Sequence, residues 1–230
     1  MSLYYNTTYP KDENNKYPEK YVKYMYERFF KKGGRILDAG CANGKFLAEL
    51  RRIDPFSFRC HGIDLREEEL ADENIYFKQC DLSKDKLPYQ DNFFDYVYTK
   101  SVISMFLDTS FFFREVHRVL KPGGKFVVLI PDWKSNYKWY WDDGTYVKAF
   151  TRKGLRELLT INGFTNEDCE YFYQLPFVWK HPKSVWINKI VAAVVPDRFK
   201  FKSREQRNTK DRKLIRFSKE KMLLAYGEKK

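Results

Sequence analysis

A short stretch from Leu37 to Gly44 places an acid and two glycines between an expected strand and an expected helix. The apolar run Arg35–Ala39 predicts a buried strand, and the amphipathic run Lys45–Arg52 predicts a helix. Gly40 and Gly44 let the backbone turn sharply and approach a ligand with no Cβ in the way. The helix beyond them offers free N–H groups and the positive end of its dipole. The pattern therefore predicts a ligand site at this turn.

The acid before the glycines narrows the choice of ligand. Asp38 would repel a diphosphate, and the G-x-x-x-G spacing lacks the third glycine of the dinucleotide fingerprint. A carboxylate at this place suits a cationic amino-acid group better. A nicotinamide-dependent dehydrogenase is therefore only a distant alternative.

The same stretch resembles motif I of class I S-adenosylmethionine-dependent methyltransferases, and the resemblance continues in order over about residues 33 to 131. Four further segments carry it: His61–Asp64, Gln79–Leu82, Leu87–Val97 and Arg114–Gly124. The last contains a turn similar to the family's "RVLKPGG". The resemblance implies an enzyme that binds S-adenosylmethionine and transfers its methyl group.

The resemblance also implies roles for particular residues. Asp64 would hold both ribose hydroxyls, and Asp81 would accept a hydrogen bond from the adenine amino group, although either could merely cap a helix or sit in a solvated loop. Lys100 and Ser101 follow the fourth expected strand, at the carboxyl edge where such sheets bind ligands. The full predicted cofactor-binding set is Asp38, Gly40, Cys41, Gly44, Asp64, Leu65, Asp81, Leu82, Lys100 and Ser101.

Strand patterns alternate with helix patterns, which predicts an α/β fold with right-handed crossovers. We expect a Rossmann-like, doubly wound, mostly parallel seven-stranded sheet with helices on both faces. The other expected strands are Phe58–Asp64, Ile75–Gln79, Phe94–Thr99, Lys125–Ile130, Glu170–Gln174 and Met222–Tyr226. The other expected helices are Pro18–Phe30, Arg66–Ala71, Ser110–Leu120 and a helix from the N-cap Thr151 to about Asn162.

We expect one methyltransferase domain over residues 1–230. Its parts are an N-terminal helical cover (1–32), a cofactor-binding core (33–131), an acceptor-side loop (132–150) and a basic insertion before the last strand (176–219).

The acceptor-side loop holds five aromatic residues and three acids between Asp132 and Asp143. Its segment "DDGTYVKAF" resembles one in bacterial methyltransferases that modify sugars or lipid-linked glycans. Those relatives commonly have a His where this chain has Tyr146, so Asp142, Asp143 or Tyr146 could substitute for it as the catalytic base. The resemblance favours an O or N acceptor on a small molecule or a sugar or lipid-linked glycan. An aromatic lid packed on the core is an equally good interpretation of the loop.

The positive charge is concentrated at the carboxyl end of the sequence. The chain has a net charge of +12, and residues 176–230 hold 16 Lys and Arg against 5 Asp and Glu. An apolar helix pattern near Val185–Val194, followed by basic residues to Arg216, could rest on an anionic membrane or meet a lipid-linked substrate through 184–216. The same residues could bind RNA phosphates, which makes an RNA-binding methyltransferase or methyltransferase-like protein the alternative. A helix that only covers the core is the third interpretation.

Other features exclude whole classes of protein. The longest apolar run, Ile190–Val195, is far below the ~20 residues of a membrane span, and the sequence opens with no secretory leader pattern. The four cysteines form no C-x-x-C pair, which argues against a zinc site or a disulfide framework. We therefore expect a protein in the cytoplasm, with a peripheral location at the membrane as the alternative, and no bound metal.

Overall fold

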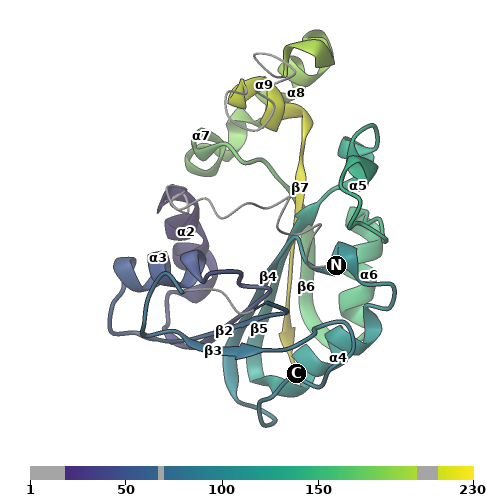
Figure 1. The fold of residues 1–230 in the computed structure, drawn as a ribbon. Coiled ribbons are helices and arrows are strands. Elements are labelled where there is room, and N and C mark those ends of the chain that lie inside the picture. Colours follow the sequence, from purple (N-terminus) through teal and green to yellow (C-terminus); the bar gives the residue numbers. More distant parts are fainter. Residues whose placement is uncertain (1–18, 67–69, 201–211) are drawn as a thin grey trace.

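The computed structural model describes residues 19–66, 70–200 and 212–230, which are built around one seven-stranded sheet (Figure 1). The strand order is β3-β2-β1-β4-β5-β7-β6. The strands are β1 (Gly34–Ala39), β2 (Phe58–Asp64), β3 (Tyr76–Gln79), β4 (Phe94–Lys100), β5 (Leu120–Pro131), β6 (Phe164–Phe172) and β7 (Met222–Lys229).

Strands β1 to β5 pair in parallel, and β7 runs antiparallel between β5 and β6. From β1 the chain moves outward through β2 and β3, then returns to place β4 on the other side of β1. This reversal is a topological switch point, where open α/β sheets bind ligands at the carboxyl ends of their strands. The predicted Rossmann-like fold is confirmed.

Helices cover both faces of the sheet (Figure 1). One face carries α2 (Glu19–Met25), a π-helical turn (Tyr26–Phe30) and α3 (Lys45–Ile53); the other carries α4 (Ser110–Val119) and α6 (Arg152–Ile161). Strand residues alternate between the two layers because successive side chains point to opposite faces. In β5, Val127 and Leu129 pack under α2 and α3, while Phe126, Val128 and Ile130 pack under α4 and α6.

Two strand predictions were wrong in their bounds. Strand β6 covers Phe164–Phe172 instead of Glu170–Gln174, since it is the outermost strand and its exposed polar residues hide the apolar pattern. Strand β5 begins at Leu120, which pairs with Phe94 before the register shifts to Lys125 against Tyr96. The intervening Lys-Pro-Gly-Gly is therefore a bulge within the strand.

Two helix predictions fall partly outside the described residues. The expected helix Arg66–Ala71 contains residues 67–69, and the expected helix Pro18–Phe30 begins at residue 18. The helix predicted after Thr151 is confirmed, because the Thr151 hydroxyl accepts the Gly154 N–H at 3.2 Å.

Short elements complete the fold beyond the carboxyl ends of the strands. The 3₁₀ turn Ile103–Met105 follows β4, and α5 (Trp133–Asn136) and the 3₁₀ turn Tyr140–Asp142 follow β5. Between β6 and β7 the chain forms α7 (Pro176–Lys180), α8 (Val185–Val194) and α9 (Lys213–Lys219), with 3₁₀ turns at Pro182–Ser184 and Asp197–Phe199.

Helices α7, α8 and α9 form a small layer at one end of the sheet (Figure 1). Their apolar residues pack into a separate cluster around Tyr173, Leu175 and Val178. Ser218 of α9 donates its hydroxyl to the side chain of Asn188 on α8 at 3.1 Å, and both residues are buried. The basic insertion is therefore built onto the domain through its own small core.

Candidate cofactor-binding site

A cavity of about 290 Å³ lies at the carboxyl ends of β1, β2 and β4, at the topological switch point. Seven of the ten predicted cofactor residues line it: Gly40, Asp64, Leu65, Asp81, Leu82, Lys100 and Ser101. The fold thus brings together residues that are up to 61 positions apart in the sequence.

The glycine turn forms the rear of this cavity. Gly40 has φ +88°, and its N–H donates to the carbonyl of Ile63 at 2.8 Å. A Cβ on Gly40 would lie 2.2 Å from Cγ2 of Val102, so the loop after β4 packs directly on the turn. Gly44, with φ +75°, caps α3 and lies outside the cavity lining. Only glycine can adopt the left-handed backbone conformation of position 40 and also leave room for the Val102 side chain.

The carboxylate of Asp64 is fixed at the end of β2. One oxygen accepts the Ala42 N–H at 2.8 Å, and the other accepts the Arg66 N–H at 3.2 Å. The two backbone donors orient the carboxylate beside the cavity, where it can still accept hydrogen bonds because each oxygen has two lone pairs. This geometry fits an acid that grips a pair of hydroxyl groups.

Asp81 also lines the cavity and is held by its own turn. Its Oδ1 accepts the N–H of Ser83 at 3.0 Å and the Ser83 hydroxyl at 2.6 Å, and Lys84 approaches Oδ2 at 3.3 Å. Burial by itself would raise the pKa of Asp81, but these hydrogen bonds and the Lys84 charge outweigh it and lower the pKa. Asp81 is therefore an ionised acceptor at neutral pH.

Asp38 ends β1 behind the cavity instead of lining it. Its side chain is only 4% exposed, and burial together with the nearby carboxylate of Asp64 raises its pKa to about 8, with Lys100 opposing the shift. A buried acid with a raised pKa is ready to pair with a positive charge, because a cation would restore its ionised form.

Lys100 and Ser101 form the edge of the cavity nearest β5. The Ser101 N–H donates to the carbonyl of Leu129 at 2.8 Å, and Ser101 has φ +57°. The Lys100 ammonium lies 5.4 Å from the ring centre of Tyr21, so α2 reaches the rim of the site.

The structure adds wall residues that the sequence reasoning missed. Arg66, Val102, Met105 and Phe106 line the cavity together with Leu65 and Leu82. Five of the six are apolar, which suits a flat aromatic base. In the loop after β4, the sequence predicted a role in the site only for Lys100 and Ser101. Apolar residues that follow them also line the cavity, and their apolar character is evident from the sequence. Cys41 is buried beneath the turn, where its sulfur would lie 2.7 Å from a Cβ on Gly62.

The predicted catalytic residues lie on a neighbouring loop and do not line this cavity. Asp142 is exposed, Asp143 accepts the Thr145 N–H and hydroxyl in a local turn, and the ring centre of Tyr146 lies 5.0 Å from that of Tyr140. The loop is tied to the 3₁₀ turn after β4 by two N–H groups, from Val147 and Lys148, that donate to the Ser104 carbonyl.

Residues 37–128 match the methyltransferase domain family. A phosphoethanolamine N-methyltransferase from Caenorhabditis elegans is 36% identical over 155 residues, which are 61% of this chain and 35% of that protein. A ubiquinone/menaquinone biosynthesis C-methyltransferase from Desulfotalea psychrophila is 31% identical over 102 residues, 42% of this chain and 41% of that protein.

Among solved structures, the chain resembles phosphoethanolamine N-methyltransferase 2 of Haemonchus contortus in complex with S-adenosylmethionine. The TM-score is 0.63 at 18% identity, and the match covers 99% of this chain and 56% of that one. The chain therefore shares the fold of this neighbour, and its residues 37–128 match the methyltransferase domain family. The chain spans about a third of the length of the first curated relatives that it matches.

Proposed function

We propose that this protein transfers a methyl group from S-adenosylmethionine to an oxygen or nitrogen atom of an acceptor bound beside the cofactor cavity. The cofactor supplies an activated sulfonium-bound methyl group, so the chain's own residues mainly align the two partners. The observation that carries the proposal is the fixed carboxylate of Asp64 in a cavity that Asp81 and apolar side chains also line.

The acceptor would enter between this cavity and the acceptor-side loop. Met105 lines the cavity, and its neighbour Ser104 holds the loop at Val147 and Lys148. Asp142, Asp143 and Tyr146 stay our candidates for a base that removes the acceptor's proton. Of the three, Tyr146 packs its ring on Tyr140, whose hydroxyl donates to the Lys148 carbonyl at 2.9 Å.

Two sets of acceptors are candidates within this proposal. A small molecule or a sugar or lipid-linked glycan was predicted from the loop, whereas the relatives are named for phosphoethanolamine, sterol and quinone chemistry. A screen for release of S-adenosylhomocysteine, with phosphorylated amines, sugars, lipid-linked glycans and RNA as acceptors, tests which class the protein methylates. Purified protein that binds neither S-adenosylmethionine nor S-adenosylhomocysteine would end the proposal.

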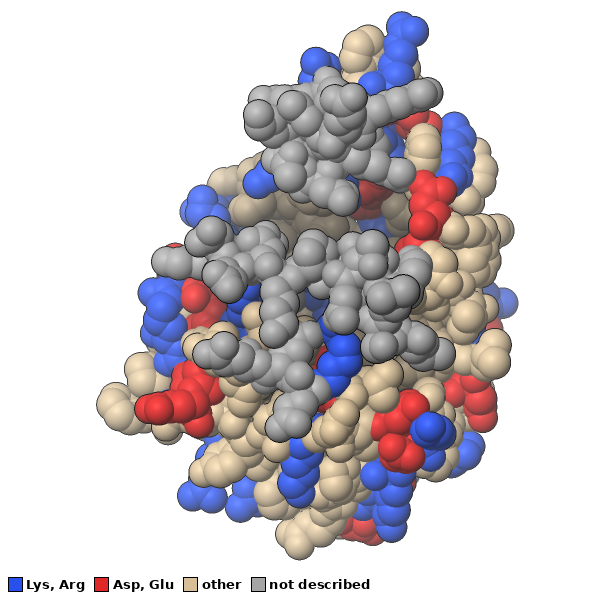
Figure 2. Space-filling model, viewed as in Figure 1, with Lys and Arg blue, Asp and Glu red and all other residues tan. Residues whose placement is uncertain are grey.

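We also propose that α8 rests on an anionic membrane surface. Trp186, Ile190 and Val194 follow one face of the helix at i, i+4 and i+8, and they are 60%, 51% and 69% exposed. The exposed Lys183 and Lys189 flank this face, and Figure 2 shows further Lys and Arg side chains at the end of the molecule where α8 and α9 lie. An apolar stripe bordered by cations is typical of helices that lie in the interface of an anionic bilayer.

No helix in residues 19–66, 70–200 or 212–230 is long and apolar enough to cross a membrane. Any contact with a bilayer by the described part of the chain would therefore be peripheral. The cytoplasmic location predicted from the sequence stays a prediction.

A further inference from the structure

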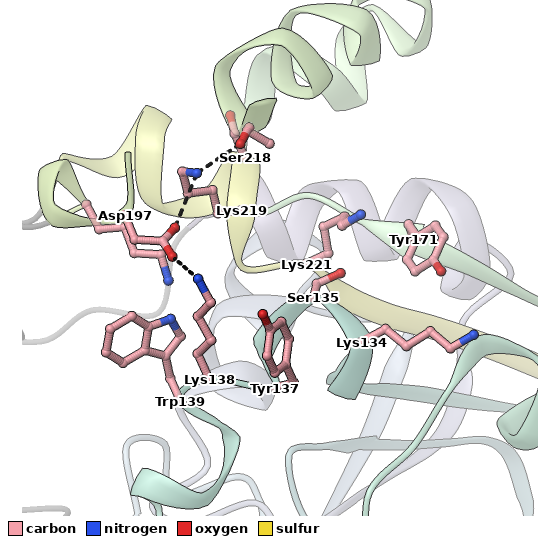
Figure 3. Close-up of a pocket in the computed structure, with 12 residues that line it drawn as sticks. Lys134, Ser135, Tyr137, Lys138, Trp139, Tyr171, Asp197, Ser218, Lys219 and Lys221 are labelled. Atoms are coloured by element: carbon pink, nitrogen blue, oxygen red, sulfur yellow. Dashed lines mark hydrogen bonds and ion pairs between the residues drawn. The ribbon is translucent and has the colours of Figure 1, made fainter. Parts of the chain in front are cut away.

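A second cavity, of about 430 Å³, lies at the same edge of the sheet (Figure 3). It is bounded by α5 and the residues after it, by the end of β6, and by α8, α9 and the start of β7. Five lysines line it: Lys134, Lys138, Lys200, Lys219 and Lys221. Among its described lining residues Asp197 is the only acid, so the cavity wall carries a large positive surplus.

Asp197 does not neutralise the cavity, since two lysines share it. Lys138 lies 3.0 Å from one carboxylate oxygen of Asp197, and Lys219 lies 3.3 Å from the other (Figure 3). The hydrogen bond from Lys138 lowers the pKa of Asp197, and the reciprocal bond raises the pKa of Lys138. Asp197 and Lys138 are therefore both charged at neutral pH, and one carboxylate faces two lysines.

Lys200 forms part of the wall behind these residues. It is 1% exposed, and its ammonium lies 3.0 Å from Glu220 and 4.8 Å from the ring centre of Trp139. A buried, fully paired lysine fixes the α9 side of the cavity.

The opposite wall is held equally firmly. The buried carboxylate of Asp132 accepts the Ser135 N–H at 2.8 Å, and the amide of Asn136 donates to the Lys221 carbonyl at 2.8 Å. These bonds fix the backbone positions from which Lys134 and Lys221 reach the cavity, so the site is preorganised.

Lys134 and Lys221 have no carboxylate partner within the described part of the chain. Lys221 instead lies 4.6 Å from the ring centre of Tyr171. The hydroxyl groups of Ser135, Tyr137 and Tyr171 belong to the same lining. Two uncompensated ammonium groups among hydroxyl donors suit a dianionic phosphate, which accepts several charge-assisted hydrogen bonds.

The position of this lysine cavity relates it to the cofactor site. Ser101 bonds to Leu129 of β5, and Pro131 at the end of β5 pairs with Met222 at the start of β7. Strands β4 and β7 are separated by β5, so their backbones lie two strand spacings apart, or about 10 Å. The lysine cavity therefore lies two strands along the same sheet edge from the end of β4.

We infer that the lysine cavity binds the phosphate group of the methyl acceptor. The inference rests on the proposed function, and it narrows the acceptor to a phosphorylated molecule whose nucleophile reaches the cofactor cavity. The group could belong to a soluble phosphate ester or to a phospholipid headgroup, which share this chemistry.

Calorimetry with inorganic phosphate tests the inference. The wild type should bind phosphate, and the double variant K134Q/K221Q should bind it at least about tenfold more weakly because two charge-assisted contacts are lost. The matched variant K31Q/K153Q, which removes two lysines outside the cavity, should bind phosphate like the wild type. Wild-type protein without phosphate affinity, or a K134Q/K221Q variant that keeps it, would overturn the inference.

Titration of S-adenosylhomocysteine separates this result from the proposed function. K134Q/K221Q should bind this nucleoside normally, since neither lysine lines the cofactor cavity. Failure of every variant and of the wild type to bind it would sink the methyltransferase proposal instead. Competition of phosphatidic acid vesicles with inorganic phosphate would assign the site to a lipid headgroup, and its absence would assign it to a soluble ester.

Discussion

Asp38 lies buried at the end of β1, and the carboxylate of Asp64 at the end of the neighbouring β2 opposes its ionisation. Burial is the larger cause of the raised pKa, and the Asp64 charge adds to it. Two acids that the sequence separates by 26 positions are therefore electrostatically coupled at one edge of the sheet. A bound cation would relieve this coupling, which links cofactor binding to pH.

We expect the affinity for S-adenosylhomocysteine, which carries an amino-acid ammonium group, to increase with pH. Asp38, with a pKa of about 8, is mostly protonated at neutral pH, and a cation favours its ionised form, so binding releases a proton. Affinity should rise up to about tenfold per pH unit below about pH 8 and level off above it. Calorimetry over this range is the measurement. Asp38→Asn should remove the slope; a flat wild-type profile would contradict the linkage.

Asp64→Ala should weaken binding of S-adenosylmethionine by about a hundredfold or more, because hydrogen bonds to an ionised carboxylate are lost. Calorimetry measures the loss. Glu157→Ala, an exposed acid on α6, is the control and should bind normally. Unchanged affinity of the Asp64 variant would refute the assignment of a ribose-binding role.

Gly40→Ala should lower the free energy of unfolding by about 2–5 kcal/mol, through left-handed backbone strain and the clash with Val102. Gly123→Ala is a matched control, because Gly123 also has positive φ but a Cβ there meets nothing within 4 Å. It should cost only about 1–2 kcal/mol. Denaturant unfolding compares the two. Equal losses would mean that close packing at Gly40 adds nothing.

Replacing Trp186 and Ile190 by Ser should reduce binding to vesicles that contain anionic phospholipid, since the exposed apolar face of α8 is removed. Co-sedimentation with anionic and with neutral vesicles is the measurement. Ile161→Ser on α6, which removes an isolated residue that is 76% exposed, should leave vesicle binding intact. A double variant that still binds anionic vesicles fully would show that α8 is not the contact surface.

Tyr146→Phe should lower kcat by about 10²–10⁴-fold with little change in KM, if the Tyr146 hydroxyl takes the acceptor's proton. Turnover of an acceptor found in the S-adenosylhomocysteine screen is the measurement. Tyr76→Phe, which alters an exposed tyrosine of β3 that lines neither cavity, serves as the comparison. Normal turnover by Tyr146→Phe would move the role of base to Asp142 or Asp143 or remove the need for one.

The sequence alone determined the architecture and the ligand-binding edge, because both follow from local patterns. The acid and glycines from Asp38 to Gly44, and an acid after the second strand, lie at strand ends whatever the rest of the chain does. The N-cap at Thr151 was equally local. Strand β6 was misplaced because exposed polar residues on its outer face obscure the apolar alternation.

Only the tertiary structure decided which distant side chains share a surface. The raised pKa of Asp38 requires burial and the approach of Asp64, and neither can be read from spacing. Lys134 and Lys221 lie 87 positions apart, yet antiparallel pairing of β5 with β7 brings them to one cavity. Local sequence fixes where each strand ends, whereas the order of strands in the sheet fixes which ends are neighbours.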